Sequence, residues 1–341
     1  MQVLGLSTLL SISSISFAEI IMRSGTAEGG ASSISWSSDE VNQLLNDDFS
    51  VAAEEPSPAG SATITTTLRH GGSVQPAAKS PRILDTNHNI SQPSVNARAA
   101  LVMDAQTGEV LYSKNTNTAL PIASITKLMT AVVISDARLN MSEQITLQQA
   151  DFSCSGCKSS SSSLRAGDSM NRAEALLFAL MKSENPAAAA LARTYPGGRS
   201  AFVAAMNSKA KELGMYSTRF LESTGLHPGN IASARDLGIL VNTASQYGLI
   251  RQFSTTPSYD FNLGYRVLKS NNTNALVRNG GWNINISKTG FINEAGRCVV
   301  MHTTLNNRPV AVVLLGANSS QARTNDATRL MTWVSSLPKR I

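Results

Sequence analysis

Aromatic and charged residues are both scarce in this chain. Aromatic side chains make up 5% of the 341 residues and charged side chains 15%. So few aromatic side chains leave little with which to stack nucleic-acid bases, and the sequence contains no arginine-rich helix, zinc-finger spacing or basic-aromatic strand motif. We therefore expect no nucleic-acid partner, even though the net charge is +6.

Cysteine and histidine are also few, which limits the ligands available to a metal ion. Cys154 and Cys157 form a Cys-x-x-Cys pair, a spacing that fits a short disulfide, a redox motif or half of a zinc site. The pair lies in a serine-rich loop, which argues against a thioredoxin-like role, and the body of the chain adds only His227 and His302 as imidazole ligands. We expect a local disulfide or free thiols in preference to a metal site, and no cofactor.

Long hydrophobic runs are missing, so we expect no transmembrane anchor. Residues 4–18 form a short, serine-rich apolar stretch in which Ser16 and Ala18 are placed like a signal-peptidase site. We interpret residues 1–18 as a signal peptide rather than a buried helix, although the usual positive start is missing. Residues 19–93 are rich in small and polar residues without a sustained period, which predicts a disordered spacer. A secreted, periplasmic protein follows from this interpretation.

The remaining residues, 94–341, have the composition of one globular domain. Residues 1–93 hold four Lys/Arg and nine Asp/Glu, whereas the rest holds 25 and 14. A basic body favours an anionic polymer or surface through long-range electrostatic attraction. With 42% hydrophobic residues overall, the chain is long enough to bury a large core.

Hydrophobic periodicity predicts strands at both ends of this body and helices between them. Strands are expected over residues 99–103, 109–113, 265–268, 282–288, 297–305 and 309–315. Helices are expected over residues 124–137, 202–213 and 324–337. Another is expected from a capping box at Asn171 and Glu174 to Ser183, one begins at Pro186 with Asn185 as N-cap, and one follows Ser233. This order indicates an α+β fold, an antiparallel sheet packed with helices plus a helical lobe.

Ser124-Ile-Thr-Lys127 opens the first of these helices. Residues at positions i and i+3 share one helix face, so Ser124 Oγ and Lys127 Nζ can meet above the first turn. A serine hydroxyl becomes a good nucleophile only when a base takes its proton, and a lysine can be that base if burial and neighbouring cations lower its pKa. The helix N-terminus adds backbone N–H groups that suit an oxyanion.

Two later motifs complete a set of three. Ser183-Glu-Asn185 is expected in a tight loop between two helices, and Lys288-Thr-Gly290 at the end of a strand. Each short motif alone is weak, and a second S-x-x-K match occurs at Ser155–Lys158 in the serine-rich loop. The three in this order, each on the expected type of element, form the signature of the penicilloyl serine transferases.

From about residue 94 onward the chain resembles the low-molecular-mass penicillin-binding proteins, the serine D-alanyl-D-alanine peptidases with a β-lactamase-like fold. Longer phrases carry the same resemblance, at residues 121–130, 183–188, 213–215 and 287–296. The last phrase, Ser287-Lys-Thr-Gly-Phe-Ile-Asn-Glu-Ala-Gly296, is most similar to the endopeptidase branch. That branch cuts the D-Ala–diaminopimelate cross-links of peptidoglycan.

The resemblance implies a role for each motif residue. Ser124 would attack the D-Ala carbonyl and form an acyl-enzyme, and Lys127 would accept its proton. Ser183 would relay a proton to the leaving amine. The substrate-binding set would be Asn185, Lys288, Thr289 and Gly290, and the oxyanion hole would use the backbone N–H groups of Ser124 and Phe291. Peptidoglycan peptides would be the substrate and β-lactams covalent inhibitors.

Three other functions fit parts of the pattern. A D-alanyl-D-alanine carboxypeptidase shares all three motifs, but only 51 residues follow Gly290, so we expect no extra β-rich domain or amphipathic membrane tail of the kind common in that branch. A class A-like β-lactamase would need an acidic residue for deacylation, and the sequence names none among Glu212, Glu222, Asp236 and Asp260. A non-catalytic wall-binding protein would leave the intact motifs unexplained.

Overall fold

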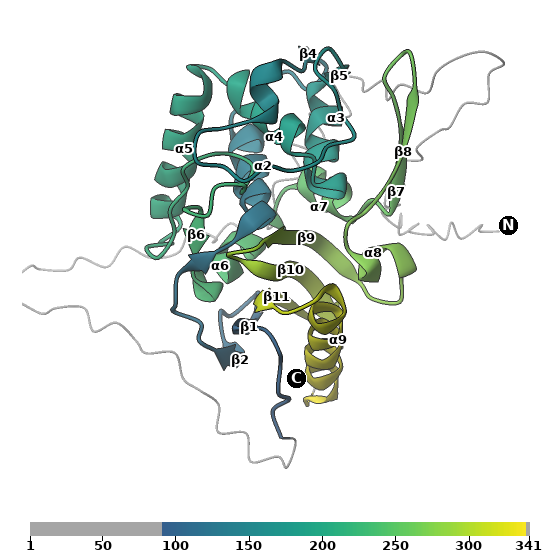
Figure 1. Cartoon of the computed structure of the whole chain (residues 1–341). Coiled ribbons are helices and arrows are strands. Elements are labelled where there is room, and N and C mark those ends of the chain that lie inside the picture. Colours follow the sequence, from purple (N-terminus) through teal and green to yellow (C-terminus); the bar gives the residue numbers. More distant parts are fainter. Residues whose placement is uncertain (1–90, 339–341) are drawn as a thin grey trace, which may run out of the picture.

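The computed structural model describes residues 91–338 and shows a sheet beside a helical lobe (Figure 1). The sheet is antiparallel, with five strands in the order β2-β1-β11-β10-β9. Their bounds are Ala99–Asp104 for β1, Val110–Lys114 for β2, Ile284–Ile292 for β9, Gly296–Leu305 for β10 and Arg308–Ala317 for β11. The predicted α+β class, with an antiparallel sheet and a helical lobe, is confirmed.

Alternate residues of the central strands face two different cores, as the pleat of a strand requires. In the β1–β11 pair, Leu101 lies opposite Val313, and both join the core shared with the helical lobe. The next pair, Val102 and Val312, joins the core beneath the terminal helix α9 (Ser320–Ser336). The sheet is therefore covered on both faces, which explains the continuous apolar runs of its strands.

Helix α2 (Thr126–Asp136) is the centre of the lobe, and its residues from Thr126 to Ser135 are all buried. It packs against four other helices, α4 (Asn185–Arg193), α5 (Gly198–Glu212), α6 (Ala234–Ala244) and α7 (Gly248–Thr255). A helix surrounded on all sides is apolar on all sides. Lys127 is thus carried into the interior by a helix that has no solvent face over most of its length.

The remaining elements are short, and several of them frame the start of α2. They are β3 (Leu120–Pro121), η1 (Ala123–Ile125), β4 (Gln144–Thr146), η2 (Gln149–Phe152), β5 (Ser169–Asn171), α3 (Arg172–Leu177), η3 (Phe178–Lys182), β6 (Ile231–Ala232), β7 (Ser258–Asn262), β8 (Val267–Asn271) and α8 (Ala275–Asn279). Strand β3 pairs with β6, β4 with β5, and β7 with β8. The capping box predicted at Asn171 and Glu174 is present, with both reciprocal hydrogen bonds.

Several predicted boundaries were wrong. Ser124 lies in the 3₁₀ turn η1, and the α-helix begins at Thr126. Glu184, not Asn185, is the N-cap of α4, because Asn185 already has helical backbone and its side chain is bound elsewhere. The strand expected at 265–268 begins only at Val267, since Tyr265 lies in the β7–β8 turn, and the terminal helix starts four residues earlier than expected, at Ser320.

The signal peptide predicted for residues 1–18 and nearly all of the spacer predicted for 19–93 lie outside the described residues. The boundary at residue 94 therefore stays a prediction. Within residues 91–338, none of the helices combines the length and the apolar character needed to cross a membrane.

Candidate active site

Lys127 contacts three oxygen atoms at the start of α2. Its Nζ donates hydrogen bonds to Ser124 Oγ at 3.0 Å, to Asn185 Oδ1 at 2.6 Å and to the Thr224 carbonyl at 2.7 Å. The Lys127 side chain has no exposed surface. Burial lowers the pKa of Lys127 from 10.5 to about 7, while the negative charges of Glu222 and Glu184 act in the opposite direction.

The backbone beside Ser124 is held in an unusual conformation. Ala123 has φ of +48°, in the left-handed region that a residue with a Cβ seldom adopts. The turn containing Gly225 presses against the same peptide, since a Cβ at Gly225 would lie 1.9 Å from Ala123 O. Strain of this kind persists only where surrounding structure imposes it. As a result, Ser124 lies in a 3₁₀ turn with its Oγ within hydrogen-bonding distance of Lys127 Nζ.

The second motif faces the first from the end of η3. Ser183 also has left-handed backbone, with φ of +66°, and it ends the π-helical turn that follows α3. Two residues later, Asn185 turns its side chain toward Lys127, while its Nδ2 donates to Ser160 Oγ at 2.8 Å. The reversal at Ser183 is what allows Ser183 and Asn185 both to reach the site.

The third motif supplies a second buried lysine. Lys288 on β9 is 1% exposed, and its Nζ donates to Ser183 Oγ at 2.9 Å. Burial lowers the pKa of Lys288 well below its usual value, and the positive charges of Lys127 and Arg323 lower it further. Lys127, Ser124 and Asn185 therefore form one hydrogen-bonded group and Lys288 and Ser183 a second, and the charges of the two lysines act on each other.

The rest of β9 runs beside the Ser124 peptide. Thr289 Oγ1 donates to Thr273 Oγ1 at 2.7 Å. A Cβ at Gly290 would lie 2.9 Å from Ile122 O and 3.1 Å from Ser124 N, so only glycine allows this approach. Phe291 follows with a ring that is 45% exposed and that stacks under the Arg297 guanidinium at 3.6 Å. The sites predicted for substrate binding and for the oxyanion hole thus meet at one edge of the sheet.

Comparison with known proteins identifies the family of the chain. The family model of the S11 peptidases, described as D-alanyl-D-alanine carboxypeptidase, matches residues 86–319. The chain belongs to the S11 peptidase family. The resemblance to the low-molecular-mass penicillin-binding proteins is confirmed, and so is the expected enzyme class, a serine-type D-alanyl-D-alanine peptidase.

Individual relatives of this S11 peptidase include both branches. The D-alanyl-D-alanine endopeptidase of Escherichia coli K12 is 46% identical over 247 residues, which cover 72% of this chain and 79% of the relative. The carboxypeptidase DacC of the same organism is 29% identical over 261 residues, 74% of this chain and 64% of DacC. The crystal structure of the Streptomyces K15 DD-transpeptidase matches with a TM-score of 0.65 at 28% identity, over 72% of this chain and all of the other.

A loop that the sequence left without a role lies over the site of this peptidase. Two residues of the second motif hold the consecutive serines at 159–163 by hydrogen bonds. Ser160 Oγ accepts a hydrogen bond from Asn185 Nδ2, and the Glu184 carboxylate accepts hydrogen bonds from Ser162 and Ser163. Lys158 forms an ion pair with Glu294 at 2.7 Å, in the turn between β9 and β10. The loop therefore contacts both the helical lobe and the sheet edge.

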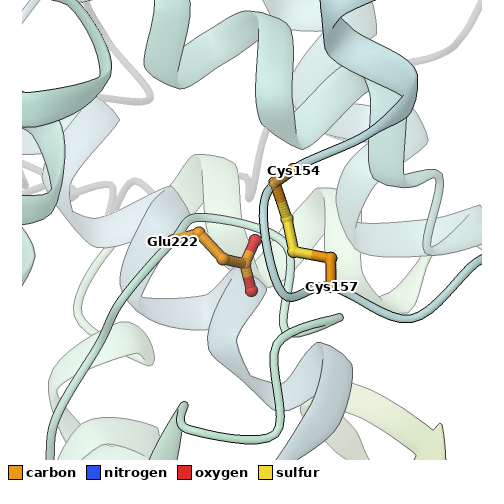
Figure 2. Close-up of side chains that lie close together, drawn as sticks. All are labelled: Cys154, Cys157 and Glu222. Carbon is orange, nitrogen blue, oxygen red and sulfur yellow. A yellow bond between two sulfur atoms is a disulfide. The ribbon is translucent and has the colours of Figure 1, made fainter.

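Cys154 and Cys157 in this loop form a disulfide, one of the two states expected for them. Their sulfur atoms and a carboxylate oxygen of Glu222 lie within 4.8 Å of one another, and Figure 2 shows the carboxylate pointing toward the disulfide. Metal binding would require free thiolates, and these sulfur atoms are bonded to each other. The geometry is that of a disulfide packed over a carboxylate.

Sequence reasoning missed three contributors to the site. The Thr224 carbonyl carries no side-chain signal, and Glu222 was considered only as a possible acid of a β-lactamase. Arg323, in the first turn of α9, donates to the Cys298 carbonyl at 3.4 Å and places a positive charge near Lys288. Arg323 precedes the predicted start of the terminal helix by one residue, so the prediction did not place it on that helix.

Proposed function

We propose that this S11 peptidase is a peptidoglycan D-alanyl-D-alanine endopeptidase that hydrolyses D-Ala–diaminopimelate cross-links through an acyl-enzyme on Ser124. The observation that carries the proposal is the environment of Lys127. A neutral lysine has two N–H groups and one lone pair, and the Asn185 and Thr224 carbonyl oxygens accept the two N–H groups. The protonated amine donates its third N–H to Ser124 Oγ at 3.0 Å, so in the neutral amine the lone pair takes that direction.

In the proposed acylation, Ser124 Oγ attacks the D-Ala carbonyl carbon while its proton moves to Lys127 Nζ. Negative charge develops on the carbonyl oxygen, and the backbone N–H groups of Ser124 and Phe291 are assigned to stabilise it. The close approach of Gly290 to the Ser124 peptide supports this assignment, because it brings the two backbones together. The C–N bond then breaks, and the acyl group remains on Ser124 as an ester.

Ser183 is assigned to return the proton. Lys127, now protonated, supplies the proton that Ser183 Oγ relays to the leaving diaminopimelate amine, and the Lys288 contact at 2.9 Å keeps Ser183 in place. Asn185 Nδ2 and the Thr289 hydroxyl are assigned to bind the substrate, with Lys288 supplying positive charge for its carboxylate. Arg323 adds to that positive charge. Water finally hydrolyses the ester.

Acylation should depend on pH through Lys127. The amine accepts a proton only when neutral, and a pKa of about 7 leaves roughly half of it neutral at pH 7 and about 1% at pH 5. We therefore expect the second-order rate constant for acylation by penicillin to rise with pH, through a midpoint near 7, and to level off above it. Timed labelling between pH 5 and 9 measures this profile. A flat profile, or one that falls with rising pH, would contradict the base role.

The branch assignment is tested with purified substrates. We expect cross-linked muropeptide dimers to be cut at the D-Ala–diaminopimelate bond, giving two monomers whose masses are read directly. The motivation is the greater identity to the endopeptidase. Release of terminal D-Ala from monomeric pentapeptides, with intact dimers, would instead assign the carboxypeptidase activity. The Ser124→Ala variant provides the blank in both digestions.

The β-lactamase alternative is disfavoured by the positions of the acidic residues. Glu222 accepts hydrogen bonds from Thr224 N and Gly225 N, and Asp236 from Ser217 N and the Thr218 hydroxyl. Glu212 is paired with Lys209, and Asp260 is exposed on the β7–β8 hairpin. None of the four is thus a free carboxylate poised to activate a deacylating water at Ser124.

We also propose that the enzyme acts in the periplasm on an anionic wall. The basic composition of residues 94–341 supports this, since an excess of positive charge prolongs contact with an anionic polymer. The hydrogen bonds of Lys127 to Ser124 and Asn185, and of Lys288 to Ser183, argue against a protein that only binds the wall.

A further inference from the structure

The turn of residues 222–227 provides the Thr224 carbonyl, and one carboxylate organises this turn. Glu222 Oε2 accepts a hydrogen bond from Thr224 N at 2.5 Å, and Oε1 accepts one from Gly225 N at 2.6 Å. The N–H of His227 lies 3.3 Å from Oε1. Three backbone N–H groups within four residues converge on one anion, as in a backbone anion nest. The direction of the Thr224 carbonyl is fixed because Glu222 holds the N–H of its own peptide group, from Gly225, and that of the preceding one, from Thr224.

A buried amide ties the same turn to the helix that carries the lysine. Asn230 has no exposed surface, and its Nδ2 lies 2.8 Å from Glu222 O, 3.1 Å from Glu222 Oε1 and 3.1 Å from Thr126 Oγ1. Thr126 is the first residue of α2 and precedes Lys127. The distance between the Thr224 carbonyl and Lys127 is therefore set by a closed set of contacts that passes through Glu222.

The disulfide lies beside this carboxylate. Cys154 and Cys157 place their sulfur atoms beside Glu222, as Figure 2 shows. The Glu222 side chain is half-buried, and the sulfur atoms offer it no strong hydrogen bond in place of water. A carboxylate with fewer water neighbours acts more strongly on nearby charges, because the local dielectric constant is lower.

We propose that Glu222 is a positioning residue for the acylation step, which acts through the Thr224 carbonyl and through its charge on the Lys127 amine. The proposal rests on the proposed function, because it assumes that Lys127 takes the proton of Ser124. Two carboxylates raise the pKa of Lys127 against the effect of burial, Glu222 more strongly than Glu184. Lys288 is the cation that faces Lys127 across the site, while the Lys158 side chain beside the turn is paired with Glu294.

The test compares Glu222→Gln, Glu222→Asp and the control Glu212→Gln in penicillin acylation from pH 5 to 9. Glutamine removes the charge and turns an N–H toward the Thr224 or Gly225 N–H, so we expect acylation about tenfold slower at its plateau and a midpoint at lower pH than in the wild type. Aspartate keeps the charge on a shorter side chain, so the midpoint should return toward that of the wild type while the plateau stays reduced. Glu212 lies at the end of α5 and is paired with Lys209, and its variant should match the wild type.

The pH midpoint separates positioning from a merely structural role. If Glu222→Gln has the wild-type midpoint, whatever its plateau rate, the proposal is overturned. Thermal unfolding of each variant establishes that the compared proteins are folded, and aspartate provides a second readout if glutamine unfolds the turn. A wild-type protein that penicillin does not acylate at all would instead refute the proposed function, so the two failures are distinguishable.

Discussion

Replacing Ser124 with alanine is expected to abolish covalent labelling by a fluorescent penicillin. In the proposed mechanism the acyl-enzyme ester forms on Ser124 Oγ, whereas the hydroxyl of Ser183 is bonded to Lys288 rather than to Lys127. Loss of one half-buried hydroxyl that accepts a single described hydrogen bond should change the free energy of unfolding by only about 1 kcal/mol. The measurement is gel fluorescence after labelling, with thermal unfolding on the same samples.

The matched control for this substitution is Ser155→Ala. Ser155 and Lys158 repeat the S-x-x-K spacing, but Ser155 is exposed in the loop between β4 and β5 and Lys158 pairs with Glu294. Labelling of this variant should equal that of the wild type. Persistent labelling of Ser124→Ala would show that another nucleophile carries the acyl group, and the assignment of the site would be lost.

The sequence predicted the parts of the site that depend on short-range spacing. Ser124 and Lys127 are three residues apart, and a helical turn of either type places their side chains together. Lys288 and Gly290 lie on a strand, where alternate residues point the same way. The sequence therefore also predicted that these two positions share one side of the strand. The order of strands and helices then gave the fold class.

Contacts between distant segments could not be read in the same way. Thr224 contributes only a carbonyl oxygen, and every residue has one. The left-handed backbone at Ala123 and Ser183 is imposed by packing against Gly225, Gly290 and η3, because neither residue type prefers it. Propensity and periodicity describe a residue and its near neighbours in the sequence. The position of the Thr224 carbonyl and the left-handed backbone of Ala123 and Ser183 depend instead on packing between segments that are far apart in the sequence.

Gly225→Ala is expected to inactivate the enzyme, because Gly225 packs directly against the backbone of Ala123 and Ser124. A Cβ at this position would lie 1.9 Å from Ala123 O, 2.3 Å from Ala123 C and 2.8 Å from Ser124 N. All three are backbone atoms, so no side chain can move aside, and either the turn or the Ser124 peptide must shift. The turn carries the Thr224 carbonyl, so both possible shifts separate Lys127 from one of its partners.

A displacement near 1 Å in a reacting pair costs about a hundredfold in rate, and we expect at least that loss in the acylation rate constant, together with a lower unfolding temperature. Gly264→Ala is the control, because Gly264 has a similar φ of +82° in the β7–β8 turn but open space where its Cβ would lie, whereas Gly225 has φ of +87°. Both substitutions therefore introduce similar backbone strain, and only Gly225→Ala adds the collision. Equal acylation rates in the two variants would contradict this prediction. They would mean that the collision at Gly225 is relieved without moving Ser124 or the Thr224 carbonyl.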